Sequence, residues 1–123
     1  MDQKKSFFQG RLFSIKNAFK GAILIFKTET SFQVQVVVAI LMTIAGFVYE
    51  ISATEWTIQL LAIALVMGLE AANTAIEDMA NFIHPEHHVE IGGIKDLAAG
   101  AVFIAVIFAI IIGFIIYIPK VFF

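Results

Sequence analysis

The sequence predicts an all-α integral membrane protein, with an N-terminal surface helix followed by three membrane-spanning helices. Hydrophobic residues make up 60% of the 123 residues and charged residues only 15%, whereas soluble domains contain roughly 25% charged residues. The mean hydropathy is correspondingly high, at +0.92. Three spans of roughly 20 residues each would occupy about half of the chain. We therefore expect residues 1–123 to form a single membrane domain.

Charge and cysteine content exclude several classes of function. The net charge is −2, and the basic residues form no dense tract, so the sequence does not indicate a nucleic-acid partner. The chain has no cysteine, which excludes disulfides, thiolate metal sites and cysteine nucleophiles.

The N-terminal segment 7–27 has the pattern of a helix that lies in the membrane interface. Apolar residues recur at helical spacing and alternate with basic residues that suit anionic headgroups. The alternative is a cytoplasmic helix that packs on its own protein. The residues that carry the pattern are Leu12, Phe13, Ile15, Phe19, Ile23 and Phe26, with Arg11, Lys16 and Lys20.

Three later segments are long enough to span a bilayer. Residues 32–49 contain only two glutamines near their start, and residues 97–118 contain no charged residue. Residues 56–82 begin equally apolar but then reach Glu70 and Glu77. The second span therefore carries carboxylates at or near membrane depth.

The basic residues predict the topology. The loop 50–55 contains neither Lys nor Arg, and Lys120 follows the third span. By the positive-inside rule, the N-terminus and the loop 83–96 should lie in the cytoplasm. The remaining basic residues all fall in those two regions: Lys4, Lys5, Arg11, Lys16, Lys20, Lys27 and Lys95.

The polar residues of the second span fall on one face of the predicted helix. At about 100° per residue, Asn73, Glu77 and Asn81 all lie within about 60° of Glu70 around the axis. A carboxylate at the bilayer centre costs roughly 2.5 to 3.5 kcal/mol on insertion scales, so this face should meet protein, water or an ion. The alternatives are that the carboxylates pair with lysines or lie at headgroup level.

Further polar residues lie at the predicted cytoplasmic ends of the spans. Glu29 precedes the first span, and Lys95 and Asp96 precede the third. Two carboxylates, Glu29 and Glu77, suit a Mg²⁺ ion that keeps most of its waters and bridges phosphates, and lysine suits phosphate oxygens. Glu70 would remain as a general base. The spacing alone also fits proton-coupled transport.

The motifs "EAANTAIED", "KDLAAGAV" and "GAILIFKTETSF" together resemble the prokaryotic diacylglycerol kinase and undecaprenol kinase family, over nearly the whole chain. The resemblance implies a small homotrimeric bundle in the bacterial inner membrane, with three spans and an amphipathic surface helix in each subunit. It implies transfer of the γ-phosphate of ATP, with Mg²⁺, to a lipid hydroxyl at the inner leaflet. A homo-oligomer is also expected because three spans enclose the polar face poorly.

The resemblance assigns roles to individual residues. It implies that Glu70 is the catalytic base and that Asn73 belongs to the same motif. It implies that Glu29 and Glu77 bind the metal ion. Glu29 and Glu77 are also expected to contact the nucleotide. The other nucleotide-contacting residues that the resemblance implies are Glu86, His87, His88, Lys95 and Asp96.

The chain also departs from the family pattern. Asn81 stands where the family usually has an aspartate, and Arg11 is the nearest match to a ligand-contacting arginine. The stretch "AAGAV" is more similar to undecaprenol kinases of Gram-positive bacteria. Diacylglycerol is the expected acceptor and undecaprenol the alternative. An alternative from a different functional class is a non-enzymatic membrane subunit that translocates ions or serves as an anchor.

Overall fold

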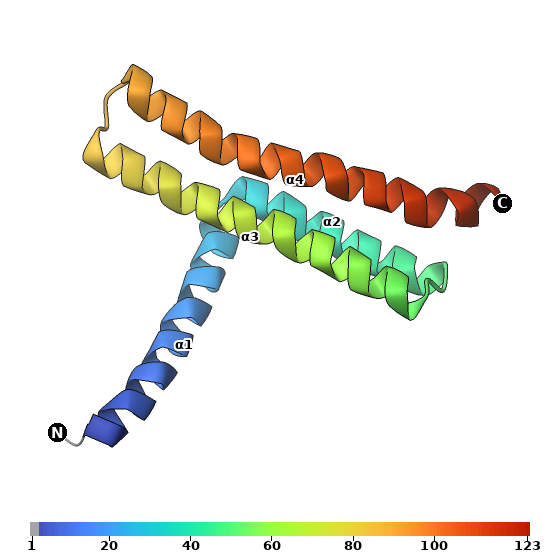
Figure 1. The fold of residues 1–123 in the computed structure, drawn as a ribbon, viewed down its shortest axis with the longest axis horizontal. Coiled ribbons are helices and arrows are strands. Elements are labelled where there is room, and N and C mark those ends of the chain that lie inside the picture. Colours follow the sequence, from blue (N-terminus) through green and yellow to red (C-terminus); the bar gives the residue numbers. More distant parts are fainter. Residues whose placement is uncertain (1–2) are drawn as a thin grey trace.

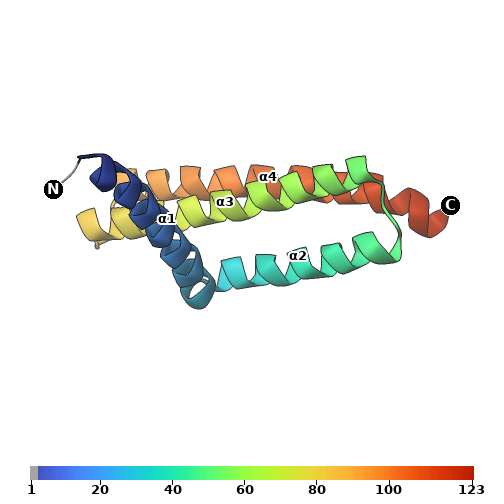
Figure 2. The same cartoon turned by 90° about the horizontal axis from the view of Figure 1, so that it is seen from below.

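The computed structural model describes residues 3–123, and every element in that part of the chain is helical. Helices α2 to α4 run alternately up and down, and α3 and α4 lie side by side along most of their length (Figures 1 and 2). Helix α1 leaves this bundle at a steep angle. The four helices are α1 (Gln3–Thr28), α2 (Thr30–Val48), α3 (Ala53–Ile83) and α4 (Val89–Phe122).

Helices α2, α3 and α4 are each long and apolar enough to cross a membrane, so the three segments predicted as spans are confirmed as long apolar helices. Many of their large apolar side chains are exposed on the isolated chain. Such exposure is incompatible with water and suits a lipid environment or a second copy of the chain.

The corner between α1 and α2 is a single residue, Glu29, whose backbone is extended at φ −106° and ψ 113°. The side chain of Gln33 stabilises this corner. Its Nε2 donates to the carbonyl oxygens of Phe26 at 2.9 Å and Lys27 at 3.3 Å. These carbonyls end a helix and would otherwise lack partners. Glu29 is thereby held at the junction of two helices.

Helix α3 begins three residues before the predicted span because a capping box starts it. The amide of Glu55 donates to Ser52 Oγ at 3.1 Å, and the amide of Ser52 donates to Glu55 Oε1 at 2.9 Å. Two backbone N–H groups at the start of the helix therefore have hydrogen-bond partners. Nearby, the ring of Trp56 lies so close to Gly46 that a Cβ there would come within 2.6 Å of a ring carbon.

A buried polar cluster ties the three spans together near the α2–α3 loop. The hydroxyl of Tyr117 in α4 donates to Gln59 Oε1 in α3 at 2.6 Å, and Gln59 Nε2 donates to the carbonyl of Met42 in α2 at 3.1 Å. Gln59 is only 4% exposed. An ion pair between Lys120 and Glu55, at 2.8 Å, lies at the same end of the bundle.

Helix α4 begins earlier than the sequence predicts. The predicted loop 83–96 is helical from Val89 onward, because His88 Nδ1 accepts a hydrogen bond from the Glu90 amide at 3.2 Å and caps the helix. A carboxylate in the first turn also favours this helix start. Lys95 and Asp96 consequently lie on the second turn of α4 and not in a loop.

Candidate functional site

The predicted polar face of α3 is partly buried within the single chain. Glu70 is 8% exposed and Asn73 is 9% exposed, and Thr74 beside them is also buried. Glu77, two turns further along, is half-buried. A carboxyl group that the fold removes from solvent is costly unless it has a role or a partner, so this part of α3 is the centre of the candidate site.

Three groups from outside the immediate turn surround Glu70. The side chain of Gln35, on α2, lies against its carboxyl group, and Glu77 and Glu29 are the charged neighbours that act on it. Glu29 comes from the α1–α2 corner, whereas Glu77 comes from α3 itself. The corner and the polar face of α3 therefore meet at Glu70.

Two buried oxygen atoms in this region have no hydrogen-bond partner within residues 3–123. They are Gln35 Oε1 and Asn73 Oδ1. An unpaired buried acceptor costs roughly 1 to 3 kcal/mol, so a water or a bound molecule would be expected to supply the donor. Gln35 is absent from the residues that the sequence singles out. Its signal was available, because a polar side chain within an otherwise apolar span is often functional.

A second set of polar residues lies nearer the α3–α4 loop. Lys95 Nζ donates to Asn81 Oδ1, which joins α4 to α3. Asn81 lies roughly 16 Å from Glu70 along the axis of α3, and Glu77 lies between them, at about 1.5 Å per residue. Glu70, Glu77 and Asn81 therefore follow one another along one face of α3, and Lys95 of α4 meets this face at Asn81.

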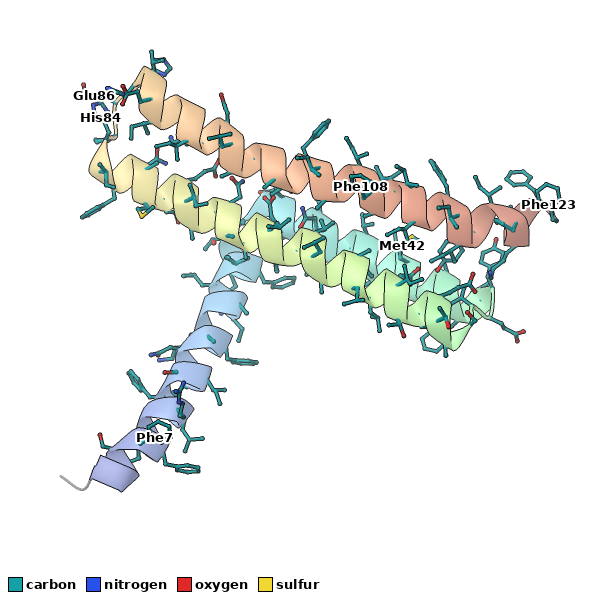
Figure 3. All side chains as sticks on the ribbon, in the orientation of Figure 1. Phe7, Met42, His84, Glu86, Phe108 and Phe123 are labelled. Atoms are coloured by element: carbon teal, nitrogen blue, oxygen red, sulfur yellow. The ribbon has the colours of Figure 1, made fainter. Side chains whose placement is uncertain are left out.

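The loop residues of the predicted nucleotide site lie at this same end. Figure 3 labels His84 and Glu86 at the tip of the α3–α4 hairpin, far from Phe123. His84 Nδ1 lies 2.8 Å from the Glu86 carbonyl oxygen, and the rings of His84 and His88 lie 4.8 Å apart. His88 Nδ1 is engaged in capping α4, whereas His87 and Asp96 are exposed.

The metal site predicted from the sequence consists of two carboxylates. Within residues 3–123, no three His, Asp or Glu side chains gather closely enough to hold an ion. Glu29 and Glu77 both lie near Glu70, and one or two carboxylates plus substrate phosphates and water is a common environment of Mg²⁺. The donor set therefore fits a magnesium ion that also binds the phosphates.

Arg11 lies far from these groups along the chain. Its guanidinium carbon is 5.2 Å from the centre of the Phe7 ring on the exposed face of α1. This contact is local to α1, and a cation over an aromatic ring at an exposed site is worth only about 0.5 to 1 kcal/mol.

Residues 16–117 match the family model described as prokaryotic diacylglycerol kinase. The chain belongs to this family. The match includes α2, α3 and most of α4, and with them every residue of the candidate site named above except Arg11. Family membership favours an enzyme over the non-enzymatic subunit that the spacing alone allowed.

The names of individual relatives support the same family assignment. The chain is 38% identical over 107 residues, 87% of each protein, to the undecaprenol kinase of Bacillus subtilis (strain 168). It is 30% identical over 94 residues, 76% of this chain and 77% of the relative, to the diacylglycerol kinase of Escherichia coli (strain K12). It is 31% identical over 110 residues to the diacylglycerol kinase of Synechocystis sp. (strain ATCC 27184 / PCC 6803 / Kazusa). The matched part is 89% of this chain and 63% of the relative. This member of the family is a membrane lipid kinase, with ATP and a lipid as its substrates.

Proposed function

We propose that this lipid kinase uses Glu70 as general base and transfers the γ-phosphate of ATP to a lipid alcohol at the cytoplasmic leaflet. The observation that supports this most strongly is the burial of Glu70 at the place where the α1–α2 corner meets the polar face of α3. Phosphoryl transfer needs reactants in line and negative charge offset, more than it needs covalent chemistry. The site offers a base, acidic metal ligands and a lysine for these tasks.

Each residue has a defined part in this mechanism. Glu70 accepts the proton of the lipid hydroxyl as the oxygen attacks the γ-phosphorus. Asn73, one turn away on the same face, orients the base or the phosphates. Lys95 offsets charge on the phosphates of ATP, and Asn81 holds it in place. When bound by Glu29 and Glu77, Mg²⁺ would neutralise charge on the β- and γ-phosphates.

The order of these residues along α3 also orients the two substrates. Lys95 and the loop residues Glu86 to His88, with Asp96, lie toward the α3–α4 loop, so the nucleotide enters from that end. The lipid hydroxyl reaches Glu70 from the apolar side. In the proposed topology the N-terminus and the α3–α4 loop are cytoplasmic, as the distribution of lysine and arginine requires.

The proposed assembly is a homotrimer in the bacterial inner membrane, with α1 lying in the interface as an amphipathic helix. The support for the trimer is the family resemblance. The support for α1 is that its apolar and basic residues from Ser6 to Leu24 are all exposed on the isolated chain, which suits a surface with both hydrocarbon and anionic groups.

Two acceptors fit the family. The sequence favours diacylglycerol, but the relative named undecaprenol kinase has the highest identity of the three compared, at 38%, over 87% of both proteins. We therefore propose undecaprenol as the acceptor and diacylglycerol as the second candidate, which the relatives from Escherichia coli and Synechocystis support.

A side-by-side transfer assay tests this function. Purified full-length protein is given ATP labelled at the γ-phosphate, with undecaprenol or diacylglycerol in the same detergent, and lipid-bound label is counted. We expect label in both lipids, with the higher kcat/KM for undecaprenol. A higher kcat/KM for diacylglycerol would reverse the order of acceptors, and label in neither lipid would refute the proposed function.

A further inference from the structure

Two histidine rings meet at the tip of the α3–α4 hairpin, where Figure 3 labels His84. The centre of the His88 ring lies 4.8 Å from the centre of the His84 ring. His84 Nδ1 lies 2.8 Å from the Glu86 carbonyl oxygen. His88 Nδ1 accepts a hydrogen bond from the Glu90 amide at 3.2 Å. The backbone therefore engages one nitrogen of each ring.

The partners of these nitrogens decide where the ring hydrogens lie. A carbonyl oxygen only accepts, so His84 Nδ1 carries a hydrogen. A backbone N–H only donates, so His88 Nδ1 carries none, and the His88 ring is neutral whenever it caps α4. A second proton on this ring would occupy Nδ1 and set two donors against each other. Protonation of His88 and the cap on α4 therefore exclude each other.

The first turn of α4 depends strongly on this cap. It contains Gly92 and Gly93, and glycine is less favourable in a helix than any residue except proline. Packing against the described residues does not require either glycine, because a Cβ at each would meet no atom within 4 Å. The Gly92 amide makes an early helical bond of this turn, to the His88 carbonyl oxygen at 2.8 Å. Without its cap, the turn that precedes Lys95 is weakly held.

The charged groups around His88 belong to the hairpin itself, because α4 packs along α3. A charge on both histidine rings is opposed by their mutual repulsion, and the positive end of α4 also opposes a charged cap. The carboxylates of the tip act in the opposite sense. A more distant set lies roughly 9 to 12 Å from the tip along the helix axes, at about 1.5 Å per residue. The near set is His84, Glu86, His87 and Glu90, and the distant set is Asp78, Lys95 and Asp96.

We propose that His88 is a proton-sensitive cap, which opens the first turn of α4 as the pH falls below neutral and thereby weakens ATP binding at Lys95 and Asp96. The capped form binds one proton fewer than the open form, so acid favours the open form. Histidine ordinarily titrates near about pH 6.5, so the response should fall between about pH 7.5 and 5.5. The effect on ATP rests on the proposed function, whereas the opening of the helix does not.

Amide hydrogen exchange on the full-length protein in detergent tests the opening of the turn. The amides of residues 90–93 are followed at about pH 7.5 and 5.5, and each rate is divided by that of an unstructured chain at the same pH. We expect the opening equilibrium to rise about three- to tenfold in acid, with residues 100–110 of α4 unchanged. Equal protection of residues 90–93 at the two pH values would overturn the proposal.

His88→Asn separates the cap from the charge. Asparagine is among the best N-cap residues and has no proton to gain in this range, so the turn should stay closed at both pH values. His87→Asn is the matched control, because His87 is the exposed neighbouring histidine, and its exchange should match the wild type at each pH. An acid response that survives in His88→Asn, or that disappears in His87→Asn, would assign the proton to another group.

Gly93→Ala strengthens the same turn and leaves both histidines in place. Alanine is favoured over glycine in a helix by a factor of about five, and its Cβ would enter open space. We expect the opening of residues 90–93 in acid to fall by about this factor. Gly113→Ala, later in α4 and equally open, is the control and should leave this opening unchanged. Equal effects of the two variants would contradict a local turn.

The kinetic consequence is a KM for ATP that depends on pH. ATP also gains a proton in this range, so the ratio of KM at pH 5.5 to KM at pH 7.5 is compared between proteins. We expect this ratio to be about two- to tenfold larger in the wild type than in His88→Asn. An equal ratio would overturn the proposal, as would a smaller one, which an imidazolium that only contacts phosphates would produce. If the wild type phosphorylates no lipid alcohol, the proposed function fails, and hydrogen exchange still decides the role of the cap.

Discussion

Lys95 of α4 donates a hydrogen bond to Asn81 of α3 across the α3–α4 hairpin. This contact ties the proposed phosphate-binding lysine to the helix that carries the proposed base. Because the asparagine side chain is neutral, it orients the ammonium group without offsetting its charge. In the proposed mechanism, asparagine in place of the aspartate that the resemblance implies leaves the full charge of Lys95 for the nucleotide.

The first prediction concerns this charge. Asn81→Asp places a carboxylate against Lys95 and near the phosphates of ATP. We expect KM for ATP to rise about three- to tenfold at low ionic strength and the effect to shrink as salt is added. Steady-state kinetics at two salt concentrations measure it. An unchanged KM at low salt would show that the charge at position 81 is dispensable.

The second prediction concerns the metal ligands. Glu77→Gln keeps the shape of the side chain but removes a carboxylate. We expect the Mg²⁺ concentration for half-maximal activity to rise at least about tenfold, by analogy with the loss of groups that support metal ligands. Glu29→Gln should act in the same direction. Glu90→Gln, at the start of α4, is the control, and an equal shift in all three variants would argue against a specific site.

The fold was largely predictable from the sequence because hydropathy and length define the spans directly. The missed start of α4 has a physical cause: His88 caps the helix through its ring nitrogen, and histidine is not among the residues that usually signal a helix start. The link between Tyr117 and Gln59 also escaped prediction. Its partners are 58 residues apart, and their pairing depends on how the helices rotate against each other.

The site was predictable only in part. The polar face of α3 followed from helical periodicity, and the burial of Glu70 and Asn73 agrees with the expectation that this face meets protein. Gln35 is on a different helix, so its contact with Glu70 arises from packing and has no counterpart in local spacing. Residue roles came from the resemblance, because burial and geometry alone do not distinguish a base from a metal ligand.

The third prediction concerns the close packing of Gly46 against Trp56. A Cβ at position 46 would lie 2.6 Å from a ring carbon, so Gly46→Ala forces the indole or α2 to move. We expect a loss of about 1 to 3 kcal/mol in the free energy of unfolding, as for other overpacked sites. Thermal unfolding in detergent measures it. Gly113→Ala, where the Cβ meets nothing, should not lower Tm.

The fourth prediction compares two polar contacts near the α2–α3 loop. Tyr117→Phe leaves the buried Gln59 Oε1 without its donor, so we expect the variant to lose about 1 to 2 kcal/mol of stability. Lys120→Met breaks a half-buried ion pair whose side chains are each 26% exposed, and an ion pair that keeps contact with water contributes little, so its Tm should stay close to that of the wild type. The reverse ranking of the two variants would contradict this assignment of stability.

In the proposed mechanism Glu70 takes the proton of the lipid hydroxyl, and the activity of Glu70→Gln measures this role. Loss of a general base lowers the rate by about 10² to 10⁴, so we predict a fall of this size in kcat for lipid phosphorylation, with the oligomer and Tm preserved. Asp78→Asn, at an exposed position of the same helix, is the matched control and should retain activity. Lipid phosphorylation by Glu70→Gln at a rate near that of the wild type would show that Glu70 is not the general base.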